Sequence, residues 1–351
     1  MPASVSFIIP NWNHGDLLAA ALASIRAQTL APLEVLVADN GSADDSIAIA
    51  EGAGAKVLPL GRNTGFSFAV NRGLEAARGE LVVILNNDVE LSPGWTETLA
   101  RAVAEPGRWF AIGKLVDHAR RDRIDGVGDA ICRGGAACRL GHGRPDGPLF
   151  DTPRCTFFPS ATALLARREF FDRAGLFDEA FFAYLEDVDL GLRAALLNLP
   201  GVYVPEAVAY HRASSTLGAR SPAMVQALTR NQILLLAKFY PAGLRRRFWR
   251  PIVVAQALWA LLALRHGHPL AYARGLLAGL KASAAVHRGA AGRWSGRDNG
   301  NELANVLMRS EAEVARFARA AGWDAYWRWY FRLAGSAGAP ESAAAPQEPA
   351  R

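Results

Sequence analysis

Over its first hundred residues the chain alternates short apolar runs with stretches that have helical spacing. The runs at 5–9, 35–38, 57–60 and 81–85 predict strands, and residues 17–27 and 66–77 predict helices. Strands separated by helices of about a dozen residues indicate βαβ units and therefore a parallel sheet. Ligands bind beyond the carboxyl ends of the strands in such sheets, so the side chains after each run are the first candidates for a site.

The rest of the chain changes character twice. Residues 117–153 are rich in glycine and arginine, which predicts irregular hairpins and a mobile loop over one face. Beyond them we expect a strand at 157–165, helices at 167–174 and 185–197, strands at 202–204 and 207–210, and helices at 222–239, 244–265, 269–287 and 299–320. At about 150 residues per domain, 351 residues predict two domains. We expect an α/β domain over 1–220 and a helical region over 221–333, followed by a disordered tail over 334–351.

Charge is divided unevenly between these regions. Residues 1–211 contain 19 Lys and Arg against 26 Asp and Glu, whereas residues 212–333 contain 19 against 5. The basic region also holds six of the nine Trp. Such a segment is typical of contact with nucleic acid, phosphate groups or an anionic membrane, and a solvated face of an ordinary helical domain is the alternative. A hydrophobic content of 51% excludes a chain that is disordered throughout.

Cysteine use and hydropathy indicate a cytoplasmic protein. The three cysteines, at 132, 138 and 155, fit neither a disulfide framework nor a zinc site, so we expect free thiols in a reducing compartment. The N-terminus has no signal-peptide pattern, and no run of 18 clean apolar residues occurs. The nearest candidate for a spanning helix, residues 251–264, contains Gln256 and has a length that suits a buried or interfacial helix.

Two polar motifs that follow predicted strands suit a nucleotide. Asp39 ends the second strand, and its carboxylate can accept a hydrogen bond from the imide N–H of a pyrimidine base. Ser42 is then expected to cap the following helix, and a turn cap is also the alternative role for Asp39 itself. Asn63-Thr64-Gly65 precedes the helix at 66–77, where a glycine-containing turn suits a phosphate or another polar ligand.

Acidic residues form two further candidate groups. Asp88 follows the fourth strand beside two amide side chains, and a single carboxylate there can hold Mg²⁺ when substrate phosphates fill the other positions. Glu186, Asp187 and Asp189 lie close together at a helix start, where like charges raise the proton affinity of a general base. A strand-ending Asp and an acidic first helical turn are the structural alternatives. His211 follows the last predicted strand and can act as a metal ligand or as an ordinary polar residue.

The chain resembles the family 2 glycosyltransferases of the GT-A fold, an α/β fold with a Rossmann-like nucleotide-sugar-binding sheet. The similar strings are VSFIIPNWN, VADNGSADDS, NTGFSFAVNRGL, LNNDVEL, FDEAFFAYLEDVDLGLR and HRASST, in that order. They extend over residues 4–240 and look most like the bacterial rhamnosyltransferase-like branch. The sequence predicts this sheet with a C-terminal helical region.

The resemblance implies a role for each matching residue. Asp187 matches the catalytic base, Asp88 matches the last Asp of the metal-binding DxD motif, and His211 matches a His that completes the metal site in several relatives. The DxD motif here reads Asn86-Asn87-Asp88, so one carboxylate remains. The implied metal is Mg²⁺ or Mn²⁺. The expected nucleotide-sugar contacts are Pro10, Asn11, Asn13, Asp39, Asn63, Gly65 and Asn87.

The function implied is inverting transfer of a sugar, rhamnose or another hexose, from a nucleoside-diphosphate sugar to a saccharide acceptor in cell-surface polysaccharide synthesis. We expect a lipid-linked acceptor at the inner face of the cytoplasmic membrane, with the basic helices touching lipid and no nucleic acid bound. The alternatives are transfer to a polyprenyl phosphate and a nucleotide-sugar-binding protein without transfer activity. A nucleotidyltransferase would have a Gly-rich phosphate loop after the first strand, where this chain has NWNHGD.

Overall fold

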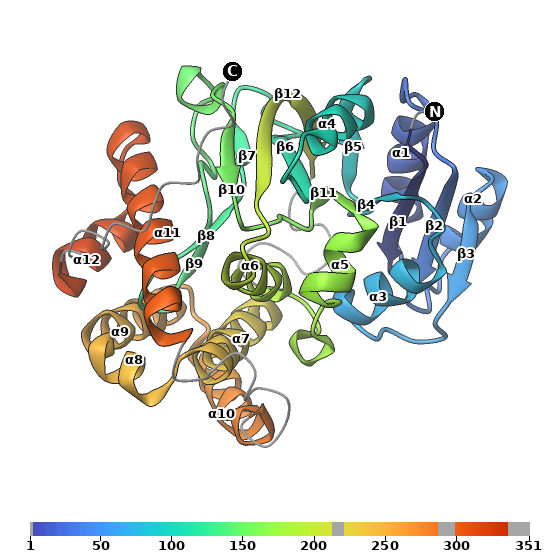
Figure 1. The fold of residues 1–351 in the computed structure, drawn as a ribbon. Coiled ribbons are helices and arrows are strands. Elements are labelled where there is room, and N and C mark those ends of the chain that lie inside the picture. Colours follow the sequence, from blue (N-terminus) through green and yellow to red (C-terminus); the bar gives the residue numbers. More distant parts are fainter. Residues whose placement is uncertain (1–2, 213–220, 287–298, 336–351) are drawn as a thin grey trace.

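The computed structural model describes residues 3–212, 221–286 and 299–335 (Figure 1). A mixed sheet forms the centre, with strand order β10-β12-β6-β11-β4-β1-β2-β3; β5 pairs with β12, β7 pairs with β6, and β8 and β9 form a separate pair. The strands are β1 (Val5–Asn11), β2 (Glu34–Asp39), β3 (Lys56–Pro59), β4 (Leu81–Leu85), β5 (Val89–Leu91), β6 (Phe110–Asp117), β7 (Ile124–Gly126), β8 (Asp129–Ile131), β9 (Ala137–Arg139), β10 (Arg154–Thr156), β11 (Ala163–Arg167) and β12 (Gly201–His211).

The N-terminal half of this sheet has the parallel order that the sequence predicts. Strands β1, β2, β3 and β4 are parallel, and the register sets Asn11 beside Asp39. Strand β11 runs antiparallel between β4 and β6, and β12 is parallel to β6. The carboxyl ends of β1, β2, β4, β6 and β12 therefore meet at one edge.

Helices cover both faces of the sheet because its central strands are apolar on both sides. In β4, Val82 and Ile84 pack with α3 and α5 on one face, and Val83 and Leu85 pack with α1 and α4 on the other. The helices of this part are α1 (Gly15–Arg26), α2 (Ser46–Gly52), α3 (Phe66–Ala76), α4 (Trp95–Ala104), α5 (Arg168–Ala174) and α6 (Glu186–Leu196), with short 3₁₀ turns η1 (Pro148–Phe150) and η2 (Glu179–Phe181).

In the described part of the chain, six helices follow the sheet. Helix α7 begins where Ser221 accepts a hydrogen bond from the Met224 amide and Pro222 takes the first helical position. Its apolar face packs against Val188 and Leu192 of α6. These helices are α7 (Pro222–Phe239), α8 (Ala242–Arg247), α9 (Trp249–Arg265), α10 (Pro269–Val286), α11 (Asn299–Ala321) and α12 (Ala325–Ala334). The predicted domain boundary and disordered tail fall at or beyond the edges of the described residues.

Three element predictions were wrong in detail, each beside a proline. The strand predicted at 157–165 begins only at Ala163, because Pro159 cannot donate a ladder hydrogen bond. Strand β12 is continuous across Pro205 but shifts register there, so two predicted short strands are one. The helix predicted at 244–265 is divided at Phe248, and Pro251, which has no N–H, lies in the first turn of α9.

The glycine-rich segment contains a hairpin, as predicted, but residues 124–136 are packed into the protein instead of forming a loop over one face. Its side chains Ile124, Val127, Ala130 and Ile131 are fully buried, and the segment forms β7, β8 and β9. Helices α2, α4 and α12 were also not predicted. Among the described helices, none has the length and apolar content needed to span a bilayer.

Candidate active site

The ends of β1, β2 and β4 are joined by side chains. Asn11 Nδ2 donates to Asp39 Oδ1 (3.5 Å), and Asn87 Nδ2 donates to Asn11 Oδ1 (2.7 Å). All three residues are buried. The parallel pairing of the strands thus brings residues from three separate sequence strings into one network.

Asp39 organises the loop that follows β2. Its Oδ2 accepts hydrogen bonds from the amides of Gly41 (3.1 Å) and Ser42 (3.0 Å), and its Oδ1 accepts from the Ser42 hydroxyl. The predicted helix cap by Ser42 is therefore wrong, since α2 begins only at Ser46. Asn13 joins the same loop, because its amide donates to Ser42 Oγ and its Oδ1 accepts from the Ala43 amide, both at 2.8 Å.

The turn at Asn63 and Gly65 is tied to another loop instead of presenting free amides. The Phe66 and Ser67 amides, the first two of α3, donate to the Phe182 carbonyl at 2.6 and 3.2 Å. The Gly65 amide donates to Asn63 Oδ1 (3.0 Å). A phosphate bound by free N–H groups at this helix start does not fit this arrangement.

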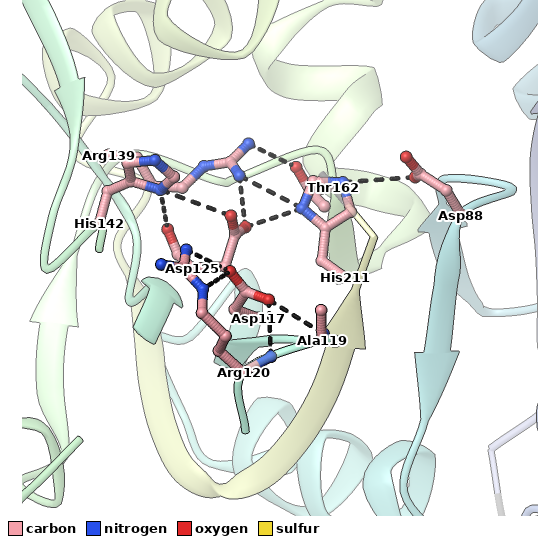
Figure 2. A network of polar contacts seen from close by, with 9 residues as sticks. All are labelled: Asp88, Asp117, Ala119, Arg120, Asp125, Arg139, His142, Thr162 and His211. Atoms are coloured by element: carbon pink, nitrogen blue, oxygen red, sulfur yellow. Dashed lines mark hydrogen bonds and ion pairs between the residues drawn. The ribbon is translucent and has the colours of Figure 1, made fainter. Parts of the chain in front are cut away.

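His211 and Asp88 lie side by side because β5, which begins directly after Asp88, pairs with the end of β12. His211 Nε2 is 3.3 Å from Asp88 Oδ1 (Figure 2). Neighbouring ligands at right angles around an ion with bonds of about 2.1 Å are separated by about 3 Å, so the pair fits one divalent cation. Within the described residues, no group of three or more His, Cys, Asp or Glu side chains is arranged to hold a metal. Any ion here would depend on substrate oxygens and water for most of its ligands.

Asp125 fixes the orientation of His211 from the other side. Its Oδ2 is 2.7 Å from His211 Nδ1 and 2.5 Å from Arg139 Nη1, and Arg139 Nη2 donates to Thr162 Oγ1 (3.0 Å; Figure 2). A carboxylate behind the imidazole holds the proton on Nδ1 and leaves Nε2 for a metal. Burial opposes ionisation of Asp125, but Arg139, His142 and His211 outweigh it and hold its pKa well below its usual range. Burial likewise opposes the charge on His211, but Asp125 and Asp88 raise its pKa to about 9, so a metal ion at Nε2 would have to displace a proton.

Gly126 provides the space for this network. A Cβ at residue 126 would overlap Cδ and Cγ of Arg139, so a larger residue would displace the guanidinium. Residues Asp125 and Gly126 both belong to β7, which pairs with β6 next to β12.

The second acidic group lies at the start of α6. Glu186 is buried, and burial and the charge of Asp187 raise its pKa. Burial also raises the pKa of Asp187, against the opposing charge of Arg139. Asp129, on β8, has its pKa raised to about 7 by burial and by the charge of Asp187. These three carboxyl groups therefore hold protons more strongly than ordinary carboxyl groups do.

Asp189 has a different environment from Asp187. It is fully buried and accepts a hydrogen bond from Arg193 Nε (2.9 Å), as the i,i+4 spacing predicts. Lys238 of α7 lies 2.6 Å from its other oxygen. Asn231 of α7 donates from Nδ2 to the carbonyls of Phe181, Ala183 and Tyr184, which fixes the loop before Asp187. Helix α7 thus positions the acidic group.

One cavity of about 650 Å³ borders both acidic groups. Eight of the ten predicted site residues line it: Pro10, Asn11, Asn63, Gly65, Asn87, Asp88, Asp187 and His211. Asn13 and Asp39 lie behind the wall, in the loop that Asp39 organises. The opposite wall comes from the C-terminal helices, with Met224 on α7, Phe317 on α11 and Trp327 on α12.

Sequence reasoning missed Asp125, Asp129 and Arg139, which all line the cavity. They come from the glycine-rich segment predicted as irregular hairpins and a mobile loop, where none of them belongs to a recognisable motif. The available signal was the apolar content of Ile124, Val127 and 130–132, which is unusual for an exposed loop.

Residues 6–173 match the sequence model of the family described as glycosyl transferase family 2. The chain is 35% identical over 242 residues to the N-acetylglucosaminyl-diphospho-decaprenol L-rhamnosyltransferase of Mycobacterium tuberculosis, in an alignment covering 60% of this chain and 76% of the relative. The protein belongs to the family 2 glycosyltransferases. This glycosyltransferase is similar to the rhamnosyltransferase-like members, as the sequence predicts. It is also 31% identical over 213 residues to the O-antigen biosynthesis protein RfbC of Myxococcus xanthus, covering 57% of this chain and 16% of that protein.

A solved structure confirms the fold prediction. The glycosyltransferase superposes on GalNAc-T7, crystallised with UDP, GalNAc and Mn²⁺, with a TM-score of 0.55 and 14% identity. The superposition covers 73% of this chain and 51% of that one. At this identity the likeness establishes the GT-A fold and leaves the ligands to be argued from the cavity.

Proposed function

We propose that this glycosyltransferase transfers a sugar from a nucleoside-diphosphate sugar to a saccharide acceptor in a single displacement that inverts the anomeric centre. The observation that carries the proposal is the position of Asp88 and Asp187 on the wall of one cavity. Inverting transfer needs a group that neutralises the leaving diphosphate and a separate group that takes the proton of the attacking hydroxyl. Asp88 with His211 suits the first role, and Asp187 the second.

The donor is proposed to lie along the edge of the N-terminal sheet. Pro10, Asn11, Asn63, Gly65 and Asn87 face the cavity there. Asp39 and Asn13 belong to the same loop network, from which Asp39 is proposed to read the nucleobase. Asp88 and His211 would hold Mg²⁺ or Mn²⁺, which supplies positive charge to the diphosphate when bound. The Mn²⁺ in the GalNAc-T7 crystal supports a divalent cation in this fold.

Asp187 is proposed to act as the general base. Burial raises its pKa, and a base with raised proton affinity accepts a proton more readily from an attacking hydroxyl. Arg139 opposes this shift and so limits how much Asp187 is protonated before reaction. Asp189 is proposed to be structural, because one of its oxygens pairs with Arg193 and the other with Lys238.

A lipid-linked acceptor and L-rhamnose as the donor sugar are the finer part of the proposal. They are supported by the name of the Mycobacterium tuberculosis relative, whose acceptor is N-acetylglucosaminyl-diphospho-decaprenol. The deciding experiment offers purified enzyme a panel of nucleoside-diphosphate sugars that includes an L-rhamnose donor, with a diphospholipid-linked N-acetylglucosamine acceptor. We expect a product whose anomeric configuration, read by NMR, is opposite to that of the donor. A retained configuration would contradict single displacement, and transfer to polyprenyl phosphate alone would favour the alternative acceptor.

The protein is proposed to act as a peripheral protein on the inner, cytoplasmic face of an anionic membrane. Residues 242–286 contain seven Lys and Arg and no Asp or Glu. Large apolar side chains are exposed on α9 and α10, including Leu261 (61%), Leu270 (71%) and Leu277 (60%). Replacing Arg245, Arg246, Arg247 and Arg250 by Gln should reduce sedimentation with anionic vesicles, since each such charge contributes about 1 kcal/mol. Unchanged sedimentation would rule out these arginines as the contact.

A further inference from the structure

The turn between β9 and η1 presents cations to the cavity that the proposed chemistry does not use. Four cationic or titratable basic side chains line the cavity in the described part of the chain: Arg139, His142, Arg144 and His211. Arg139 and His211 are paired with Asp125. Arg144 is partly buried, and among the described residues no carboxylate lies within 4 Å of it. A guanidinium that faces a cavity without an acidic partner is suited to an anionic ligand.

The backbone of this turn is fixed, so its side chains have defined positions. The Ile124 amide donates to the Arg144 carbonyl (2.8 Å), the Gly143 amide to the Ile124 carbonyl (2.8 Å), and the Arg144 amide to the Gly141 carbonyl (3.0 Å). With these amides used, an anion would contact side chains. His142 lies on the same turn, and its Nδ1 is 3.0 Å from the Asp125 carbonyl oxygen. A hydrogen bond to Asp125 raises the pKa of His142, which adds positive charge beside Arg144.

Arg144 lies against the C-terminal helices, which carry none of the residues proposed to hold the donor. A Cβ at Gly322, at the junction of α11 and α12, would lie 3.3 Å from Arg144 Nη1. The cavity wall next to this junction is apolar, with Phe317, Ala321 and Trp327. A cationic side chain beside an apolar surface suits a diphosphate followed by a lipid, which is their order in a diphospholipid-linked saccharide.

We infer that Arg144, assisted by His142, binds a phosphate of the acceptor, and that the adjoining faces of α11 and α12 contact the beginning of its lipid chain. This rests on the proposed function, in which the donor diphosphate is held at Asp88 and His211. The shared chemistry is a diphosphate esterified at both ends, which both donor and acceptor contain, so the test must separate the two substrates.

The experiment compares Arg144→Gln with the wild type on two acceptors. One is N-acetylglucosaminyl diphosphate with a short alkyl chain, and the other is the alkyl N-acetylglucosaminide without phosphate. We expect KM for the diphosphate acceptor to rise at least about tenfold, because a charge-assisted bidentate contact is lost. KM for the phosphate-free acceptor and for the donor should stay the same, and Arg144→Lys should restore part of the loss. Arg120→Gln is the matched control, since Arg120 pairs with Asp117 outside the cavity.

Equal losses on both acceptors would overturn the inference, and so would a loss confined to the donor. A second measurement does not depend on transfer. In EDTA, which removes metal-dependent donor binding, calorimetry should detect the alkyl diphosphate acceptor on the wild type and at least about tenfold weaker binding on Arg144→Gln. If the wild type transfers to neither acceptor, the proposed function fails while this binding result still decides the inference. Equal binding by both proteins would overturn it.

Discussion

Two acidic groups lie at the cavity wall: the first is Asp88 and Asp125, on either side of His211, and the second is Asp129, Glu186 and Asp187. They differ in how their charge is balanced. Asp125 has Arg139 and His211 at 2.5 and 2.7 Å, and Asp88 lies beside the other nitrogen of His211. Cations therefore alternate with carboxylates, and the pKa of Asp125 is well below its usual range. The charge of Arg139 lowers the pKa of both Asp129 and Asp187, but burial raises it by more. The pKa values of both are therefore raised.

Carboxyl groups in one cavity are thus suited to two opposite chemical roles. Carboxylates that stay ionised are suited to a cation, and carboxyl groups with raised proton affinity are suited to receiving a proton. Arg139 interacts with both groups. It contacts Asp125 directly and acts electrostatically on Asp129 and Asp187. The following substitutions test whether the two groups are functionally separate.

The largest effect is expected for Asp187→Asn, which keeps the size of the side chain but removes the proton acceptor. Transfer should fall by about a hundredfold to ten-thousandfold, the range a positioned general base contributes. Donor and metal affinity should remain near those of the wild type, because the first acidic group is intact. Calorimetry of donor binding and single-turnover transfer measure the two quantities separately.

Two control variants help to interpret the result for Asp187→Asn. Asp16→Asn removes an exposed carboxylate outside the cavity and should transfer normally. Asp189→Asn should lower stability by roughly 3–5 kcal/mol, since it leaves Arg193 and Lys238 without their buried acidic partner. A folded Asp189→Asn enzyme that has lost transfer, together with an active Asp187→Asn enzyme, would reverse the assignment within α6.

Asp88→Asn should weaken metal-dependent donor binding by about a hundredfold, because a directly coordinating carboxylate is lost. Its fold should persist, since the residue lies beyond the end of β4. Glu90→Gln is the matched control: Glu90 is two residues further along and pairs with Arg212 and His118 outside the cavity. Donor affinity that is equally strong in both variants would exclude Asp88 as a ligand.

The sequence predicted the parts of this site that depend on local patterns. Asp88 follows an apolar strand, and the pair of Asp189 with Arg193 follows from helical spacing, so both could be read within a few residues. The edge proposed to hold the nucleotide was also predictable, because successive parallel strands place their ends together.

The parts that were missed depend on pairings between distant segments. Asp125 reaches His211 only because β7 pairs with β6, which is parallel to β12, a separation of 86 residues. No local pattern marks that pairing, and Gly126, which makes room for Arg139, lies in a segment with the composition of a loop. Gly126 is required by close packing against Arg139, which composition alone does not distinguish from a flexible turn.

A smaller effect is expected for Asp125→Asn, which changes only the first acidic group. It removes the carboxylate that orients His211. Donor binding that depends on metal should weaken by about tenfold, the lower end for a group that orients a ligand. Transfer from saturating donor and metal should be largely kept, because Asp187 is unchanged. Titration of the donor at several Mn²⁺ concentrations measures the effect, and Asp117→Asn, which removes a carboxylate paired with Arg120, is the control. A loss of transfer at saturating metal would mean that the two groups are coupled through Arg139.

The smallest effect, and the most specific to the second group, is a change in the pH dependence of transfer for Asp129→Asn. The pKa of Asp129 is raised to about 7 by burial and by the charge of Asp187, so the two carboxyl groups lose their protons in linked steps. Ionised Asp129 repels the carboxylate of Asp187 and raises its proton affinity, whereas Asn has no charge. The acidic limb of the kcat profile should therefore move to lower pH, by less than about one unit, and become steeper because one of the coupled ionisations is removed. Asp122→Asn, an exposed residue outside the cavity, should leave the limb in place. An acidic limb that moves to higher pH, or does not move, would show that the ionisation of Asp129 is not coupled to that of Asp187.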